Sequence, residues 1–191
     1  MSEKFVVNDP HHLAARWVRP STVKHLLDGS GFSQKPNALE ILLSQFAFDY
    51  QNPPHTYPYS QYLAVAEYIR HNYYSHLNEE AGYELLGYLA VMDYYNGSVG
   101  RIVKMAAALL GPQKIAKQFL TKITGTLSWA EHSLEFESPH AARYHTRYVP
   151  SPAAMMRGAI KASLEISGAK ITELYTITVT EENVIHVIKW S

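Results

Sequence analysis

The ten histidines are the side chains of this chain best suited to metal or acid–base chemistry. The pairs that lie closest along the chain lack the four-residue spacing that places two imidazoles on one helical face for zinc. His132, His140 and His145 fall within one expected hairpin, but His132 and Glu135 are three residues apart along a strand and so point to opposite faces. We therefore expect no metal ligands, and a metal-dependent enzyme that uses the hairpin histidines is kept as an alternative.

Signatures of nucleophilic catalysis and of phosphate binding are missing from the sequence. A nucleophilic serine needs a nearby base and an oxyanion site, and no Gly-x-Ser-x-Gly elbow occurs. Gly97-Ser-Val-Gly100 could offer backbone amides to an anion, but Ser98 as a helix N-cap explains the same pattern. With no cysteine, the chain has no thiolate metal site, cysteine nucleophile or disulfide. We expect no catalytic residue and a protein that is not an enzyme.

The chain has 191 residues with 17 basic and 17 acidic side chains, and 47% of its residues are hydrophobic. This composition predicts one compact domain. Balanced charge and an isoelectric point near 7.2 argue against a nucleic-acid partner, because phosphate binding favours a strongly basic domain. No apolar run approaches the roughly 18 residues of a membrane-spanning helix, and we find no signal peptide. We therefore expect a cytoplasmic protein.

Apolar periodicity and turn residues predict helices first and strands afterwards. Helices are expected at 20–28, 38–50, 60–76, 78–96, 99–110 and 112–122, then strands at 128–136 and 143–149, a helix at 152–167, and strands at 171–180 and 184–190. This order indicates an α+β fold, in which N-terminal helices precede a ββαββ antiparallel sheet. A proline-rich run at 51–58 separates an N-terminal arm or helical cover (1–56) from a helical plus ββαββ domain (57–191).

Two of the expected helices have unusual surfaces. Helix 99–110 has little polar face beyond Arg101 and Lys104, so it is expected to be the most buried helix. Tyrosines gather in the helices between residues 57 and 95. If these tyrosines form one exposed face, the helix from Tyr62 to Tyr74 is expected to pair with its copy in a homodimer.

A set of glycines and apolar positions provides a family resemblance. The string Leu109-Leu-Gly-Pro-Gln-Lys-Ile115, the glycines at 125, 158 and 168, and the terminal Trp190 resemble a bacterial family of similar length that is expanded in the myxobacteria. The resemblance covers residues 57–190. That family is in turn similar to the superfamily of heme nitric-oxide-binding sensor domains, vinyl-reductase-type ligand-binding domains and TRAPP transport subunits. The resemblance implies a sensory or scaffold module with an apolar cavity between the helices and the ββαββ sheet.

The resemblance also permits a test for heme. Heme nitric-oxide sensors use a histidine on the helix before the sheet and a Tyr-x-Ser-x-Arg motif on a strand. The nearest string in this chain is Tyr144-His-Thr-Arg-Tyr148, in which tyrosine stands where the arginine should be. No histidine lies between His76 and His132, so helices 99–110 and 112–122 offer no axial ligand. We therefore expect no cofactor, heme of this type included.

These observations lead to one hypothesis and two alternatives. We expect a non-enzymatic, sensory or small-molecule-binding module whose ligand is apolar or anionic, with its cavity between helix 99–110, helix 152–167 and the sheet. The alternatives are a protein–protein scaffold that dimerises without a ligand, and the metal-dependent enzyme named above. The residues expected to line the cavity or to supply polarity at its mouth are Met105, Leu109, Tyr144, Arg147, Tyr148, Met156 and Ile160.

Overall fold

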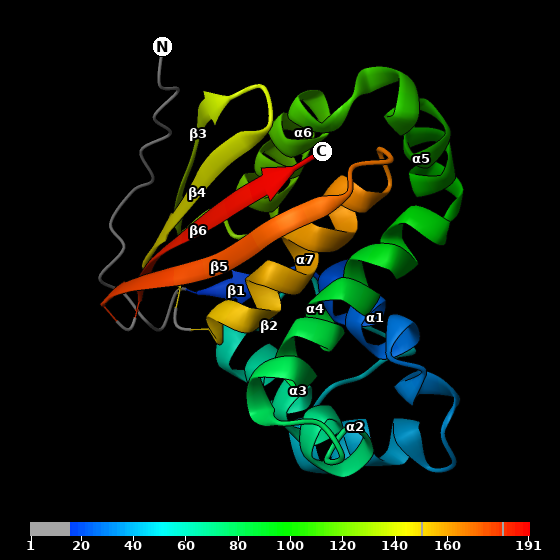
Figure 1. Ribbon diagram of the computed structural model, residues 1–191. Coiled ribbons are helices and arrows are strands. Elements are labelled where there is room, and N and C mark those ends of the chain that lie inside the picture. The colour runs from blue at the N-terminus through cyan, green and yellow to red at the C-terminus, as the bar shows by residue number, and fades with distance from the viewer. Residues whose placement is uncertain (1–15, 150, 181) are drawn as a thin grey trace.

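The computed structural model describes residues 16–149, 151–180 and 182–191 (Figure 1). Its elements follow in the order β1 (Trp17–Val18), α1 (Pro20–Gly29), the 3-10 helix η2 (Phe32–Gln34), α2 (Ala38–Phe46), β2 (Tyr57–Pro58), α3 (Tyr59–Tyr73), α4 (Glu79–Asn96), α5 (Ser98–Leu110), α6 (Pro112–Thr126), β3 (Glu131–Ser138), β4 (Ala141–Arg147), α7 (Ala153–Glu165), β5 (Ile171–Thr180) and β6 (Asn183–Trp190). None of the helices in this described part combines the length and the apolar character that crossing a lipid bilayer requires.

The last third of the chain forms one four-stranded antiparallel sheet. The strand order is β3-β4-β6-β5, so each hairpin contributes two neighbouring strands and α7 connects the hairpins. The pairing of Tyr144 with His186 fixes the register between the two hairpins. The two-residue strands β1 and β2 form a separate antiparallel sheet. The α+β fold with a ββαββ sheet, predicted from the sequence, is confirmed.

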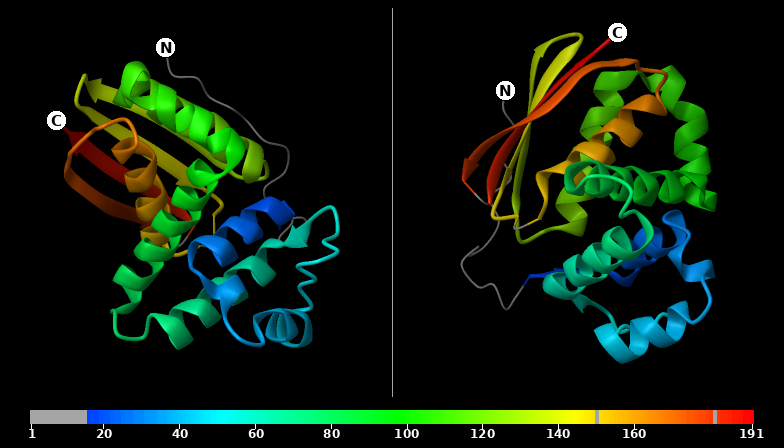
Figure 2. Two further views of the ribbon diagram at one scale, coloured as in Figure 1. Left: turned by 90° about the vertical axis from the view of Figure 1, so that its right-hand side faces the viewer. Right: turned by 60° about the horizontal axis from the view of Figure 1, so that its bottom comes forward.

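Two helices cover one face of the sheet. In Figure 2, α6 and α7 lie across the same side of the strands. Their apolar residues form one core cluster with side chains of β4 and β6, and its largest members include Phe119, Tyr144, Leu164 and Trp190. Alternation along the strands produces this arrangement, because residues two apart share a face of the sheet.

The other helices build a second core around α4. Val23, Leu26 and Leu27 of α1 and Val65 and Ile69 of α3 are fully buried in it. Figure 1 shows α4 running between this helical part and the part formed by α7 and the sheet. The N-terminal helices thus share one core with α3 and α4, and the division at residue 56 stays a prediction.

Glycines set the close approach of α4 and α7. A Cβ at Gly158 would overlap the carbonyl oxygen of Glu84, and a Cβ at Gly87 would overlap the carbonyl oxygen of Met155. The two backbones therefore touch, which requires a residue without a side chain at both positions. This contact fixes the spacing between the two helical layers.

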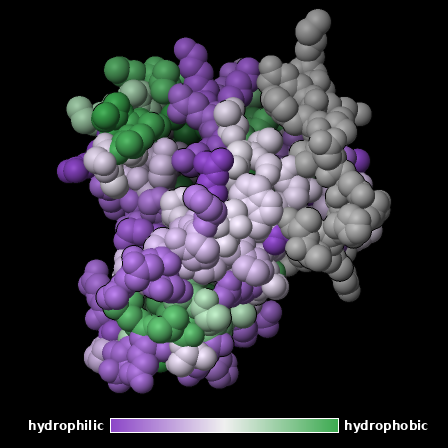
Figure 3. Space-filling model, turned by 180° about the vertical axis from the view of Figure 1, so that it is seen from behind, coloured by the Kyte–Doolittle hydropathy of each residue, from purple (hydrophilic) through white to green (hydrophobic). Residues whose placement is uncertain are grey.

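Helix α5 differs from its prediction. Val99, Ile102, Met105 and Leu109 are 66% to 90% exposed, and the buried residues of the helix are Gly100 and Ala107. Gly100 packs against the backbone of Tyr94 and Tyr95 at the end of α4, and the apolar stripe formed by the four exposed residues points outward, where no described element covers it. Figure 3 shows the resulting hydrophobic patch at the α5 end of the molecule. The expectation that α5 is the most buried helix is wrong.

Candidate ligand-binding cavity

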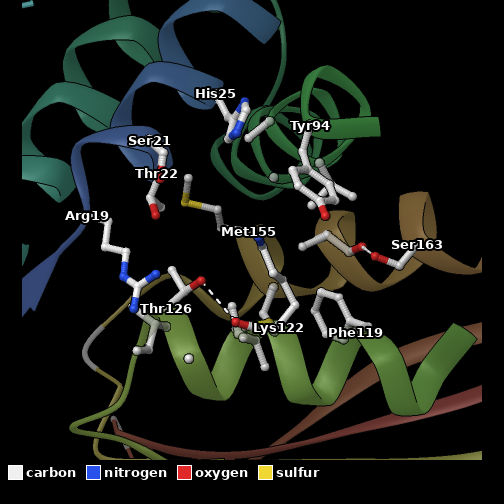
Figure 4. A pocket seen from close by; sticks show the side chains of 18 of the residues that line it. Arg19, Ser21, Thr22, His25, Tyr94, Phe119, Lys122, Thr126, Met155 and Ser163 are labelled. Carbon is white, nitrogen blue, oxygen red and sulfur yellow. Dashed lines mark hydrogen bonds between the residues drawn. The ribbon is translucent and has the colours of Figure 1, made fainter. Parts of the chain in front are cut away.

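A cavity of about 540 Å³ lies among the helices. Helices α1 and α4 line one side and α6 lines the opposite side, and α7, which packs directly on α4, lies between them (Figure 4). Helix α3 adds Tyr59 and Tyr62, and α5 adds only Val103 among the described residues. The volume lies within the roughly 300–1,000 Å³ that is usual for small-molecule sites.

The interior of the cavity is apolar and uncharged. Phe119, Met155 and Met156 line it together with the buried Tyr62. The Tyr62 hydroxyl lies 3.9 Å from the Met155 sulfur and donates to it. Burial raises the pKa of Tyr62 and raises the pKa of Tyr59 to about 12, so both hydroxyls stay neutral at physiological pH. A ligand that reaches this region would meet mainly hydrocarbon, aromatic and thioether groups.

The rim of the cavity carries positive side chains. Arg19 stands at the start of α1, and Lys122 rises from α6 on the opposite wall (Figure 4). The Lys122 Nζ lies 4.4 Å from the ring centroid of Tyr94. His25 also lines the cavity, and its Nδ1 lies 2.9 Å from the Asp93 carboxylate. None of the described residues that line the cavity is acidic.

The structure separates the predicted apolar site residues. Met156 lines the cavity. Met105 and Leu109 lie on the surface of α5, 80% and 90% exposed. Ile160 and Tyr144 are buried between α6, α7 and the sheet, around a hollow of about 10 Å³ that is large enough for one water at most.

The two remaining predicted site residues lie at the end of β4: Arg147 is its last residue and Tyr148 follows it. Arg147 is exposed, and its Nη1 lies 3.5 Å from the Glu131 carboxylate. Tyr148 has a φ of 67°, and its backbone N–H donates to the side-chain oxygen of Asn183. Neither residue lines the cavity described above.

The cavity therefore lies elsewhere than predicted. The sequence placed it between helix 99–110, helix 152–167 and the sheet, whereas no residue of the four sheet strands lines it. The physical reason is that α6 and α7 close the sheet with well-packed side chains. The open space lies on the far side of these two helices, facing α1 and α4. The only sequence feature that could have indicated this cavity is weak: small residues line it on α4 (Gly87 and Ala90) and on α7 (Ala159).

The tyrosines between residues 57 and 95 are all buried or half-buried. Tyr59, Tyr62, Tyr83 and Tyr95 are less than 10% exposed. The Tyr74 hydroxyl donates to the backbone carbonyl of Ser30. A homodimer through residues 62–74 is expected only if the tyrosines form one exposed face. They do not form such a face.

The hairpin histidines do not meet. His132 is 2% exposed and faces the helices, whereas His145 pairs with Ser133 on the opposite face of the sheet, and His140 is exposed in the turn. No group of three or more metal-ligating histidine, aspartate or glutamate side chains occurs in the described ranges.

A row of buried polar side chains crosses the helix-facing side of the sheet. We call His132, Tyr144, His186, Thr176 and Arg157 the buried polar row. The Tyr144 hydroxyl lies 2.8 Å from His132 Nδ1, and the Thr176 hydroxyl lies 3.0 Å from His186 Nδ1. Burial lowers the pKa of His132 to about 4 and that of His186 to about 3. Both imidazoles are therefore neutral in the folded protein near pH 7.

Arg157 connects the buried polar row to α4. Its guanidinium donates to Thr176 at 3.3 Å, to Glu84 at 3.1 Å and to Glu80 at 2.5 Å. The side chain is 10% exposed, and the two carboxylates satisfy its charge. Sequence reasoning missed this residue, because a single arginine in an amphipathic helix has no distinguishing pattern.

Solved structures with a similar fold are H-NOX domains. An Fe(II) unliganded H-NOX protein from K. algicida matches with a TM-score of 0.59 and 11% identity, over 91% of this chain and 96% of that chain. An oxygen-binding H-NOX domain related to soluble guanylate cyclases, solved as its oxygen complex, matches with a TM-score of 0.56 and 12% identity, over 90% and 92%. These matches show a common fold and confirm the resemblance stated from the sequence. No curated protein is detectably similar to the chain.

The cavity does not fit heme in the manner that this resemblance implies. Helix α6, which precedes the sheet, contains no histidine. Tyr144 and Thr146, which stand in the nearest string to the Tyr-x-Ser-x-Arg motif, are 1% and 2% exposed and do not line the cavity. Among the described residues, the histidine that lines it is His25, which lies on α1 and not on the helix that the resemblance requires.

One family model matches most of the sequence. It spans residues 23–191, from within α1 to Ser191, and so includes the whole sheet and every described lining residue of the cavity except Arg19, Ser21 and Thr22. The chain belongs to the family described as "protein of unknown function (DUF2378)".

Proposed function

We propose that this protein is a non-enzymatic module that binds a small, largely apolar molecule in the cavity between α1, α4, α6 and α7. The observation that carries the proposal is a space of about 540 Å³ whose interior is built from aromatic and methionine side chains. Pre-formed apolar cavities with a few polar groups at the rim are the usual sites of small-molecule binding. The H-NOX-like fold supports the same reading at the level of the fold alone.

A sensory role follows from the position of the cavity. One wall belongs to helices that pack in the N-terminal core, and the other belongs to helices that pack on the sheet. A ligand that contacts both walls would stabilise one relative placement of the two parts over others. Occupancy of the cavity would in this way be transmitted to the sheet through α6 and α7.

Binding of a neutral fluorescent probe tests the proposal. N-phenyl-1-naphthylamine should bind at one saturable site with increased emission. Ala159→Phe, which places a ring in the cavity, should abolish the signal, whereas Ala108→Phe, the same change at an exposed position of α5, should leave it intact. Thermal unfolding of each variant verifies folding. Saturable binding that survives in a folded Ala159→Phe protein, or no saturable binding to the original chain, would refute the proposal.

In this proposal the ligand is not a heme held by α6. Hemin titration tests this point, because ligation to a protein side chain shifts the Soret band. We expect no saturable shift. A stoichiometric shift that disappears in His25→Ala would instead make His25 a heme ligand and would contradict the proposal.

A self-associating scaffold is the second candidate, favoured by the exposed apolar stripe of α5. In this alternative a second copy of the chain covers Ile102, Met105 and Leu109, and the protein is a homodimer. Light scattering after size exclusion would then show a dimer that Met105→Glu converts to a monomer. A monomer at all concentrations would leave this candidate without support. Cytoplasmic location stays a prediction.

A further inference from the structure

The charges at the rim of the cavity restrict the class of ligand. Arg19 and Lys122 come from opposite walls, and neither forms an ion pair with an acidic residue in the described part of the chain. Asp93 of α4, the neighbour of the lining residue Tyr94, is bound to His25. Within the described residues, the rim therefore carries cations without acidic counterparts.

The start of α1 adds to this positive field. Arg19 is its N-cap residue, its side chain makes no capping hydrogen bond, and the first turn contains no acidic residue. Backbone N–H groups at a helix start carry partial positive charge. Ser21 and Thr22 in this turn also line the cavity and add hydroxyl groups (Figure 4). The hydroxyl of Thr126 on α6, which lines the cavity too, donates to the backbone carbonyl of Lys122. Donors thus gather at one end of the cavity.

The buried lining of the cavity has a different character from its rim. Tyr62 and Met155 are less than 10% exposed, and neither carries a charge. A neutral apolar ligand would leave the rim cations unpaired, and a small inorganic anion would leave the apolar space unfilled. A molecule with an apolar body and one anionic headgroup matches both the rim and the buried lining.

We infer that the ligand is an anionic amphiphile, with its carboxylate or phosphate headgroup between Arg19 and Lys122 and its apolar body against Tyr62 and Met155. This inference rests on the proposed function and names the ligand class of the same cavity. It differs from the sequence expectation, which placed polarity at Tyr144, Arg147 and Tyr148. Arg19 and Lys122 belong to no sequence motif that would mark them as a site. They come together only because α1 packs on α4 and α6 packs on α7.

Three ligands with the same ten-carbon chain test the inference: decanoate, decyl phosphate and decanol. In displacement of the neutral naphthylamine probe, we expect the better of the two anions to bind roughly tenfold more tightly than decanol, and this anion identifies the headgroup. Arg19→Gln and Lys122→Gln should each weaken the anion about fivefold and leave decanol unchanged, because each removes one partly solvated cation. Lys114→Gln, an exposed lysine of α6 outside the cavity, is the matched control.

The outcomes separate the inference from the proposed function. Equal displacement by the anions and decanol, or an anion preference that survives in the Arg19→Gln, Lys122→Gln double variant, would overturn the headgroup assignment and leave the cavity proposal intact. Failure of all three ligands and of the probe would overturn the binding function itself. Both rim residues are exposed, so the variants are expected to fold, and their thermal midpoints verify this.

Discussion

The two buried histidines of the polar row should make the protein lose stability as the pH falls from 7 to 5. His132 and His186 are 2% and 0% exposed, and burial lowers their pKa values to about 4 and about 3. Arg157, which contacts Thr176 next to His186, lowers the pKa of His186 further. Near pH 6.5 the histidines of the unfolded chain take up protons, whereas these two remain neutral in the folded protein.

The magnitude follows from proton linkage. A group with a lowered native pKa reduces the free energy of unfolding by about 1.36 kcal/mol for each pH unit below its unfolded pKa, until the native pKa is reached. At pH 5, which is about 1.5 units below the unfolded value, each histidine costs about 2 kcal/mol, so the pair costs about 4 kcal/mol. A typical domain has only about 5–15 kcal/mol of stability, so the loss is large.

Acidic groups add little in this window. The pKa of Glu67 is lowered to about 2, chiefly by its hydrogen bond to Arg70. A lowered carboxyl pKa stabilises the fold above the unfolded pKa and loses that effect only as the pH falls below about 4.5. The range from pH 7 to 5 therefore reports mainly on histidines.

Urea unfolding at pH 7 and pH 5 measures the effect. The double variant His132→Gln, His186→Gln should lose about 4 kcal/mol less than the original chain between the two pH values. His140→Gln removes an exposed histidine of the same hairpin and controls for the loss of an imidazole as such. If the double variant and the original chain show the same loss, the two histidines are not held neutral and the reasoning is refuted.

Three further predictions concern packing and are measured by chemical denaturation. Gly158→Ala forces a methyl group into the Glu84 carbonyl and should lower the free energy of unfolding by about 2 kcal/mol. Gly125→Ala, whose methyl group meets no atom within 4 Å, should leave the free energy of unfolding unchanged or raise it by about 0.5 kcal/mol. Equal effects of the two changes would refute the close contact between α4 and α7. Arg157→Met leaves Glu84 unpaired and should lower the free energy of unfolding by about 2 kcal/mol. This is less than the loss at a fully buried ion pair, because the other partner, Glu80, is 68% exposed. An unchanged free energy of unfolding would mean that the ion pairs of Arg157 do not stabilise the fold. Leu86→Ala removes a fully buried side chain and should lower the free energy of unfolding by about 3 kcal/mol. Leu109→Ala should lower it by less than about 0.5 kcal/mol, because Leu109 is 90% exposed. A large loss of stability in Leu109→Ala would contradict the outward orientation of the apolar stripe of α5.

The order and type of the elements could be predicted because local signals are strong in this chain. Pro112 after Gly111 starts α6 at the predicted residue, and the β-branched run at 171–180 forms β5 with the predicted ends. The period of the apolar residues changes from helical to alternating after Gly125, and the structure turns from helix to sheet shortly afterwards. Each of these signals depends on neighbouring residues alone. The helices and strands that they specify can therefore be predicted without knowing the tertiary contacts.

Burial and the position of the site could not be predicted in the same way. The composition of α5 suggests a core helix, but its buried residues are Gly100 and Ala107, and four of its larger apolar residues, Val99, Ile102, Met105 and Leu109, are exposed. Whether a helix buries its small or its large side chains depends on how closely its neighbours approach. The cavity depends on the same information, because Gly87 and Gly158 set the distance between α4 and α7.

We expect an anionic amphiphile to enter the cavity with its apolar end innermost. A crystal structure with ω-bromodecanoate tests this orientation, since bromine is located by its anomalous scattering. We expect one bromine peak against Tyr62 and Met155 and density for the carboxylate between Arg19 and Lys122. A bromine peak at the rim, or on the exposed stripe of α5 with the cavity unchanged, would refute this mode of binding.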